Sequence, residues 1–436
     1  MKQVLSILFV LGLVLAGCSA APVAPAPASS DGAPTAAAAT TLRVMDSFTD
    51  EGMNAGIEKL NQMFMAKYPE IVIQREAVVT EDMRTIVQTT LSANEAPDII
   101  YYDTGPGFAG VLASAGLIRP IDDLYEQYGW DEQIFPWTKA RTTFDEKVYG
   151  IGNELEFYGA YYNKNLFEQL GLSIPQSYEE LLNICKVAQD NGLVAISFAD
   201  QGKWPAYHMF SIVANNVLGK EKMDALLFGD GRWDDPEVAE AIRIWFDDMN
   251  KAGCFVPDTA AVSYDDGATL FYSGQALMHF TGTWLMGQVL ENAQGFDVGW
   301  LFFPSVGEKP VLPPAGLGSG YFVSANSQNV EAAGKYLDFL FSDEAAQVWM
   351  EDVKIVLPMD VDAAQYELPD LFKFAVDALA QQEMGYNIDV LTPDNFNTMM
   401  GDGFQAVLLG EKTPEQQAAD LQAAWEQAIA EGKIQR

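Results

Sequence analysis

Apolar residues along most of this chain alternate between strand-like runs and helix-like spacing. Leu42–Met45 is a short apolar run typical of a strand, and the apolar residues of segment 53–64 recur every three or four positions, as on one helix face. The remaining predicted strands are 71–79, 97–102 and 193–198, and the remaining predicted helices are 81–94, 108–115, 178–190, 235–249, 331–341 and the segment from Pro414 onward. Strands separated by helices predict an α/β protein with a mostly parallel sheet covered on both faces.

The N-terminus has the layout of a secretory signal. Lys2 precedes the almost wholly apolar segment Val4–Leu15. This segment is too short to span a membrane, which takes roughly 20 apolar residues, and it is followed by small residues, as at a signal cleavage site. We therefore predict that residues 1–17 are a signal peptide.

The residues at the end of this signal resemble a bacterial lipobox. They read Leu15-Ala16-Gly17-Cys18, and in a lipobox the cysteine is lipidated and becomes the new N-terminus. The following residues are rich in Ala, Pro and Ser and carry a single charge, at Asp31. Such a segment buries no core, so we expect residues 18–41 to be a lipidated Cys18 followed by an extended tether. The alternative is an ordinary signal peptide with a chance cysteine.

Composition narrows the class of protein. The chain has 436 residues, a length that suits two domains. Its formal net charge of −36 argues against binding to nucleic acid, whose phosphates require a basic face. Cys185 and Cys254 remain if Cys18 is lipidated. An extracytoplasmic setting permits a disulfide between them, but the sequence does not show whether they are adjacent.

Several short motifs match one family in order and spacing. They are 96–100 with 115–121, Tyr161–Phe167 with 171–172 and 175–181, 272–278 with 282–284, and 331–346 with 357–358. Ser177 and Tyr178 stand where the family more often has Thr and Trp. The motifs resemble those of the extracellular solute-binding proteins of ATP-driven sugar importers, the maltose-binding-protein-like family. The resemblance extends from Leu42 to the C-terminus.

This resemblance implies a type II periplasmic-binding-protein-like fold: two α/β lobes, each a sheet flanked by helices, interleaved by hinge crossovers. The N-terminal lobe would comprise residues 41–152 and 312–356, and the C-terminal lobe residues 153–311 and 357–436. It also implies capture of a carbohydrate between the lobes and delivery to an ABC-type membrane permease. We expect a monomer, lipid-anchored outside the cytoplasm, with no cofactor, no metal and no catalysed reaction.

Candidate binding residues come from position and from the resemblance. Sugar hydroxyls call for carboxylates, and sugar faces call for aromatic rings. Ligands of open α/β sheets lie beyond the carboxyl ends of strands, and the resemblance gives Tyr102, Trp204 and Trp284 as aromatic contacts and Glu156 as a ligand carboxylate. The full set of candidates is Asp46, Ser47, Tyr102, Asp103, Glu156, Tyr158, Trp204, His208, Trp284, Gly316 and Ser319.

Structural alternatives stand beside these assignments. A Trp or Tyr among apolar residues is usually part of the core, Asp46 could cap a helix, and a lone His such as His208 near an aromatic ring is more often structural. We expect His279 to be packed, and we assign four further tryptophans to structural roles: Trp233, Trp245, Trp349 and Trp425.

Two other function classes stay open. A glycoside hydrolase needs two carboxylates about 5–10 Å apart, and a chain with 61 acidic residues always offers such a pair. A binding protein for a polyamine would also use carboxylates and aromatic rings. Two histidines, three cysteines and no D-x-[DN]-x-[DN]-G loop disfavour a metal site.

Overall fold

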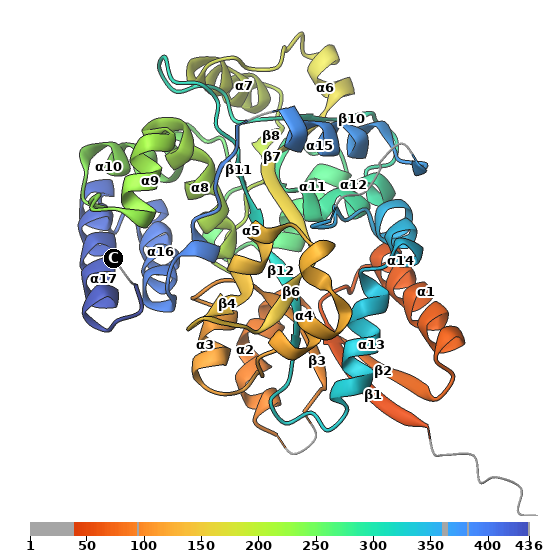
Figure 1. Ribbon diagram of the computed structural model, residues 1–436. Helices are drawn as coiled ribbons and strands as arrows, with labels where there is room; N and C mark the ends of the chain where they lie inside the picture. The colour runs from red at the N-terminus through yellow and green to blue at the C-terminus, as the bar shows by residue number, and fades with distance from the viewer. Residues whose placement is uncertain (1–38, 94–95, 360–364, 382, 435–436) are drawn as a thin grey trace, which may run out of the picture. The chain divides into compact units, whose positions relative to one another are not determined.

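Two larger sheets, each flanked by helices, organise the chain (Figure 1). The computed structural model describes residues 39–93, 96–359, 365–381 and 383–434. The predicted signal peptide, Cys18 and the predicted tether as far as residue 38 lie outside the described residues. Among the described residues, no helix combines the length and the apolar character needed to span a bilayer.

The first sheet has five strands in the order β2-β1-β3-β12-β6. β1 runs parallel to both β2 and β3, whereas β12 runs antiparallel to β3 and β6. The strands are β1 Thr40–Asp46, β2 Ile71–Ala77, β3 Ile99–Asp103, β6 Gly150–Gly152 and β12 Ser319–Val323. Leu42 and Val44 are buried at alternate positions of β1, because successive strand residues face opposite sides of a sheet.

The second sheet has six strands in the order β13-β11-β7-β9-β8, with β10 also paired to β7. β7 runs antiparallel to β9, β10 and β11, and the two edge pairings, β8 with β9 and β13 with β11, are parallel. The strands are β7 Leu155–Asn163, β8 Val194–Ile196, β9 Ala276–Gly282, β10 Val298–Leu301, β11 Pro314–Leu317 and β13 Gly385–Tyr386. A small separate hairpin pairs β4 Thr143–Phe144 with β5 Lys147–Val148.

The prediction of a mostly parallel sheet is therefore wrong. Among the described strands, β1, β2 and β3 follow the strand-helix-strand pattern that places parallel strands side by side. The other strands pair with segments far away in sequence: Tyr321 of β12 lies opposite Tyr101 of β3, and Ala160 of β7 lies opposite Phe280 of β9. Local spacing carries no information on the direction of such long-range pairs.

Each helix predicted from the sequence is present in the structure, and several helices begin at an N-cap. Asp50, Ser177 and Thr413 each accept a hydrogen bond from a backbone N–H of the following first turn, as N-caps do. The helices are α1 Glu51–Lys67, α2 Thr80–Leu91, α3 Ala109–Ser114, α4 Asp122–Tyr128, α5 Pro136–Lys139, α6 Lys164–Gln169, α7 Tyr178–Asp190, α8 Trp204–Leu218, α9 Lys220–Phe228, α10 Pro236–Ile242, α11 Tyr264–Tyr272, α12 Met286–Asn292, α13 Val330–Leu340, α14 Asp343–Val348, α15 Asp370–Gln381, α16 Asp394–Leu408 and α17 Pro414–Ala430.

Helix α13 packs against β1 and β12 of the first sheet. The segment predicted as one helix over 235–249 continues from α10 into a π-helical stretch at Arg243–Met249.

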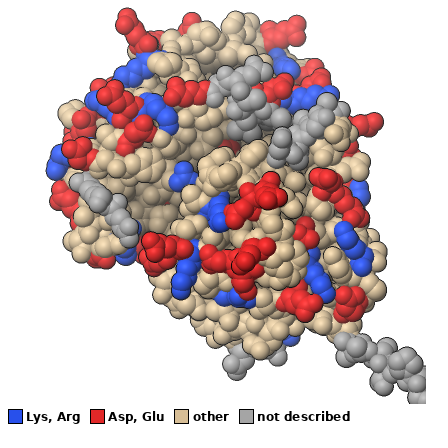
Figure 2. Space-filling model, in the orientation of Figure 1, with Lys and Arg blue, Asp and Glu red and all other residues tan. Residues whose placement is uncertain are grey.

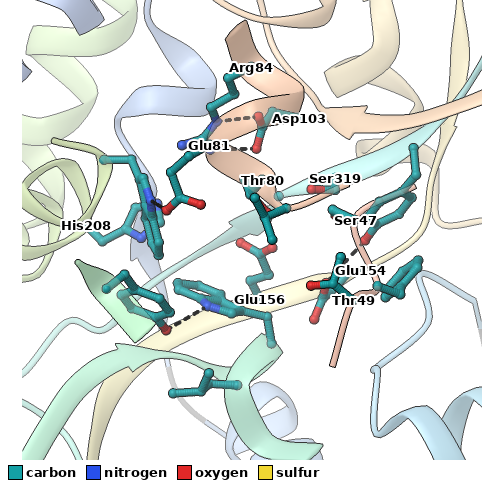
Figure 3. Close-up of a pocket in the computed structure, with 18 of the residues that line it drawn as sticks. Ser47, Thr49, Thr80, Glu81, Arg84, Asp103, Glu154, Glu156, His208 and Ser319 are labelled. Carbon is teal, nitrogen blue, oxygen red and sulfur yellow. Dashed lines mark hydrogen bonds and ion pairs between the residues drawn. The ribbon is translucent and has the colours of Figure 1, made fainter. Parts of the chain in front are cut away.

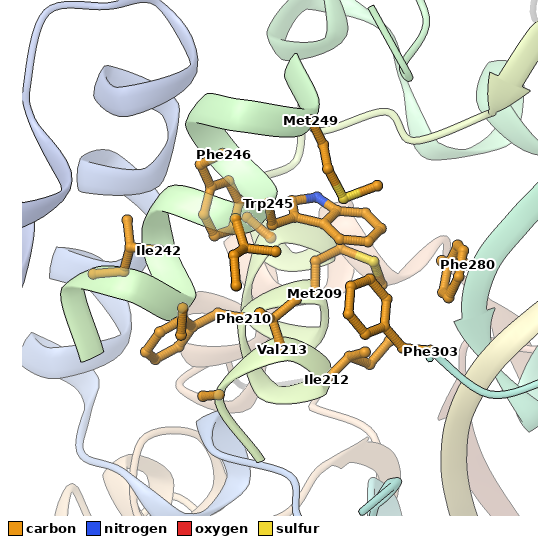
Figure 4. Packing of buried hydrophobic residues seen from close by; sticks show 14 of the residues in the cluster. Met209, Phe210, Ile212, Val213, Ile242, Trp245, Phe246, Met249, Phe280 and Phe303 are labelled. Atoms are coloured by element: carbon orange, nitrogen blue, oxygen red, sulfur yellow. The ribbon is translucent and has the colours of Figure 1, made fainter. Parts of the chain in front are cut away.

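Large apolar side chains of the second sheet and its helices form an extensive core (Figure 4). Trp245 lies at its centre, 5.1 Å from Phe255 and 5.5 Å from Phe280 between ring centroids. Trp233, Trp349 and Trp425 are also buried, so the four tryptophans assigned to structural roles are confirmed. His279 is buried in β9 as well, with its Nδ1 2.8 Å from Ser197 Oγ.

A disulfide joins Cys185 of α7 to Cys254. It closes a loop across a sequence separation of 69 residues, and this loop contains β8, α8, α9 and α10. The question that the sequence left open is thereby answered.

The chain passes from the first sheet to the second between β6 and β7, returns between β11 and β12, and passes to the second sheet again between β12 and β13. The predicted residue limits of the two lobes stay a prediction. Acidic and basic side chains are interspersed over the face seen in the space-filling view (Figure 2), consistent with net charge spread along the chain.

Candidate functional site

A pocket of about 160 Å³ lies where the ends of several strands and helices meet. This volume far exceeds the roughly 15 Å³ that admits one water molecule, so the pocket has room for a small organic ligand. Its lining residues are Ser47, Phe48, Thr49, Asp50, Met53, Val79, Thr80, Glu81, Arg84, Tyr101, Asp103, Glu154, Glu156, Trp204, His208, Tyr264, Asp265, Trp284, Leu285, Gln288, Gly318, Ser319, Asn387, Asp389 and Val390.

The structure brings together seven of the eleven candidates in this pocket. They are Ser47, Asp103, Glu156, Trp204, His208, Trp284 and Ser319. Whether each of them contacts a ligand stays a prediction.

Four candidates lie outside the lining. The carboxylate of Asp46 is 1% exposed and accepts two hydrogen bonds from the Arg75 guanidinium, at 2.6 and 2.7 Å. Tyr102 is buried beside Phe108. Tyr158 is buried beside the rings of His208 and Trp284, at centroid distances of 4.6 and 5.3 Å. Gly316 lies within β11, opposite Glu156 of β7.

Aromatic rings form one wall of the pocket. The Trp204 ring lies 4.5 Å from the Tyr264 ring and 6.2 Å from the Trp284 ring, between centroids. Trp284 donates from its indole nitrogen to the Tyr264 hydroxyl at 3.2 Å. Its ring folds back over Gly282, where a Cβ would meet ring carbons at 1.7 Å, so glycine is required at that position.

A hydrogen bond from Trp204 at the start of α8 links this helix to α2 across the pocket. Its indole nitrogen donates to the Glu81 carboxylate of α2 at 2.7 Å, and Glu81 belongs to the group of carboxylates drawn in Figure 3. A longer hydrogen bond of 3.4 Å runs from Gln288 of α12 to Asp50 at the start of α1.

Arg84, the one arginine among the described residues of the pocket lining, is bound to a carboxylate. Arg84 donates from Nε and Nη2 to the two oxygens of Asp103, at 2.7 and 2.8 Å (Figure 3). Burial lowers the pKa of Arg84, but the Asp103 charge outweighs it and holds the pKa above its ordinary value. This guanidinium is therefore neutralised within the protein.

Two glutamates at alternate positions face the pocket floor. Burial raises the pKa of Glu154 to about 8, although a 3.3 Å hydrogen bond from the Tyr101 hydroxyl opposes the shift. Burial also raises the pKa of Glu156 well above its ordinary value, and repulsion from Glu154, Asp389 and Asp103 adds to the shift. A ligand that donates hydrogen bonds here relieves the cost of burying these groups.

Several lining residues were not among the candidates predicted from the sequence. Glu81 and Arg84 project from α2, Tyr264 starts α11, and Asp389 lies in a short helical turn at Asp389–Leu391. Glu154 had a usable local signal, because it lies two positions before Glu156 and alternate residues of an extended chain share a face. The others carry no signal in local spacing.

The sequence and the fold match known proteins. Residues 46–347 match the family described as bacterial extracellular solute-binding protein. An extracellular-binding protein of an ABC transporter from Pyrococcus horikoshii is 23% identical over 356 residues, which cover 78% of this chain and 77% of the relative. The diacetylchitobiose binding protein of Streptomyces coelicolor is 24% identical over 307 residues, which cover 66% of this chain and 64% of the relative.

Among solved structures, a chitin oligosaccharide binding protein is similar to this chain with a TM-score of 0.79 at 22% identity. The match covers 90% of this chain and 99% of that protein. This likeness confirms the predicted fold class, a two-lobe α/β solute-binding fold.

Proposed function

Because the chain belongs to the family of bacterial extracellular solute-binding proteins, we propose that it captures a carbohydrate outside the cytoplasm and delivers it to the permease of an ABC importer. Two similar proteins support the choice of ligand class, since their names state that they bind diacetylchitobiose and chitin oligosaccharide. The relatives are binding proteins, so we propose that this chain releases its ligand chemically unchanged.

The observation that carries this proposal is the composition of the pocket. A wall of Trp204, Tyr264 and Trp284 faces the same space as the carboxylates of Glu154 and Glu156. Aromatic rings stack on the C–H faces of a sugar, and carboxylates accept hydrogen bonds from its hydroxyls. A phosphate ester fits poorly, since Asp103 already neutralises Arg84.

A thermal-shift screen against mono- and oligosaccharides tests the proposal, with calorimetry on each hit. Binding at a hundredfold excess over Kd raises the stability of the folded state by about 2.7 kcal/mol. One-to-one binding with intact recovery of the sugar supports the proposal. Hydrolysis that Glu156→Gln abolishes would favour the glycoside hydrolase instead, and no sugar hit at all would contradict the carbohydrate assignment.

We also propose that the protein is exported, cleaved before Cys18 and held at the membrane by a lipid on that residue. The lipobox-like residues support this, and the oxidised Cys185–Cys254 pair fits an extracytoplasmic location. Cys18→Ala should release a folded protein from the membrane fraction. A wild-type protein that is already soluble and begins at another residue would refute the anchor.

A further inference from the structure

The charge of the pocket is strongly one-sided. Seven acidic side chains line it, and among the described residues Arg84 is its one Lys or Arg. Arg84 is bound by Asp103 through two hydrogen bonds. The acidic residues beyond that pair are Asp50, Glu81, Glu154, Glu156, Asp265 and Asp389.

Two of these carboxylates are buried with oxygens that lack a hydrogen-bond partner. Glu156 is 7% exposed and makes no hydrogen bond or ion pair with another described residue. Asp389 is 2% exposed, its Oδ1 has no hydrogen-bond partner, and its Oδ2 lies 3.5 Å from His208 Nε2. Glu156 points toward the centre of the pocket in Figure 3.

This arrangement favours a cation over a neutral hydrogen-bond donor. A hydroxyl supplies a donor but no charge, whereas an ammonium group supplies donors together with the opposite charge that favours the ionised form of a buried carboxylate. The neighbouring Trp204, Tyr264 and Trp284 faces also attract cations. No group of His, Cys, Asp and Glu in the described part of the chain is arranged to hold a metal ion.

We propose that the sugar bound in this pocket is an amino sugar whose protonated amine lies against Glu156, with Glu154 and Asp389 beside it. The ring of such a sugar presents a flat C–H face to the aromatic wall and an amine at its edge. This inference rests on the proposed carbohydrate function and specifies the class of sugar. Burial raises the pKa of both Glu154 and Glu156, and a protonated amine beside them would favour their charged forms.

Matched sugars test the proposal. Glucosamine, N-acetylglucosamine and glucose share one ring and differ at the second carbon, which carries an amine, an acetamide or a hydroxyl. Each is titrated calorimetrically as the monomer and as the β-1,4-linked dimer at pH 6, where the amine is charged, with spermidine as a cation that is not a sugar. We expect the amine sugar to bind at least about tenfold more tightly than its two counterparts.

The outcomes separate the two proposals. Equal or tighter binding of the acetamide or hydroxyl sugar overturns the amino-sugar inference and leaves the carbohydrate function standing. Binding of spermidine without any sugar overturns both. Failure of all of these probes to bind overturns the amino-sugar inference.

Charge-neutralising variants provide a second measurement. Glu156→Gln keeps the shape and the hydrogen-bonding capacity of the side chain but removes its charge, so the preference for the amine sugar should fall about tenfold or more. Binding of the hydroxyl sugar should change only a few-fold. The control is Glu76→Gln on the exposed side of β2, which should change neither. Equal losses for the amine and hydroxyl sugars in a Glu156→Gln protein with an unchanged melting curve would overturn the role of charge.

Discussion

Gly318 lies directly against the carboxylate of Glu156, which offers a way to disturb the pocket without disturbing the fold. A Cβ at Gly318 would lie 1.8 Å from Glu156 Oε1 and 2.2 Å from Oε2. The obstructing atoms are the free end of a flexible side chain, and Glu156 has no hydrogen bond to lose. Gly318→Ala should therefore displace the Glu156 carboxylate at little cost to stability.

The size of the effect follows from the geometry. Ordinary contact begins at 3.4 Å, so the nearer oxygen must move by about 1.6 Å to restore van der Waals distance. Such a shift lengthens a hydrogen bond beyond the range in which it counts as one. Losing a hydrogen bond to a charged group costs about 1.5–3 kcal/mol, which weakens Kd about ten- to hundredfold.

The assay combines calorimetry, with the sugar that binds the wild type most tightly, and melting curves of the unliganded proteins. Gly320→Ala is the matched control, because its Cβ would meet the backbone oxygen of Ile151 at 2.5 Å and backbone does not yield easily. Gly318→Ala should lose affinity and keep its melting temperature, while Gly320→Ala should lose melting temperature. Unchanged affinity in Gly318→Ala would show that the Glu156 carboxylate does not touch the ligand.

Three further predictions follow from the pocket and the disulfide. Trp284→Ala should weaken sugar binding by about 1–3 kcal/mol through lost apolar contact; a lower melting temperature with unchanged affinity would instead assign Trp284 to the core. Replacing Cys185 and Cys254 together by Ala should lower the free energy of unfolding by about 4 kcal/mol, because the disulfide closes a loop across 69 residues; an unchanged urea midpoint would contradict this. Burial raises the pKa of Glu154 from 4.5 to about 8. Between these two pH values the folded state binds more protons than the unfolded state, so the folded state loses stability as the pH rises. The melting temperature of Glu154→Gln relative to wild type should therefore increase from pH 5 to pH 9, and a constant difference would refute the shift.

Local pattern was sufficient for elements whose signals are local. The spacing of Met53, Ile57, Leu60 and Phe64 predicted α1, and the helix predicted over 178–190 has the bounds of α7. These features depend on neighbours within one or two turns. Strand directions were missed because they depend on segments that return from far along the chain.

The candidate site likewise contains residues that local signals or the resemblance could find and residues whose roles depend on long-range pairing. Ser47 and Asp103 were found because they follow strand ends, and Glu156, Trp204 and Trp284 because of the resemblance. Asp46 also follows a strand end, yet its carboxylate binds Arg75. That pairing depends on the register between β1 and β2, where Val44 lies opposite Arg75. Local spacing does not specify this register.

The Cys185–Cys254 bond has a consequence for the order of events during export. The loop that it closes contains Trp204 and His208, two residues that line the pocket. The disulfide therefore constrains this part of the pocket only after the two thiols have been oxidised. The newly made chain holds three cysteines, which allow three different intrachain pairs. If Cys18 is acylated as proposed, its thiol is consumed and a single pair remains. Lipid attachment to Cys18 before oxidation would then prevent the two incorrect disulfides, Cys18–Cys185 and Cys18–Cys254, from forming.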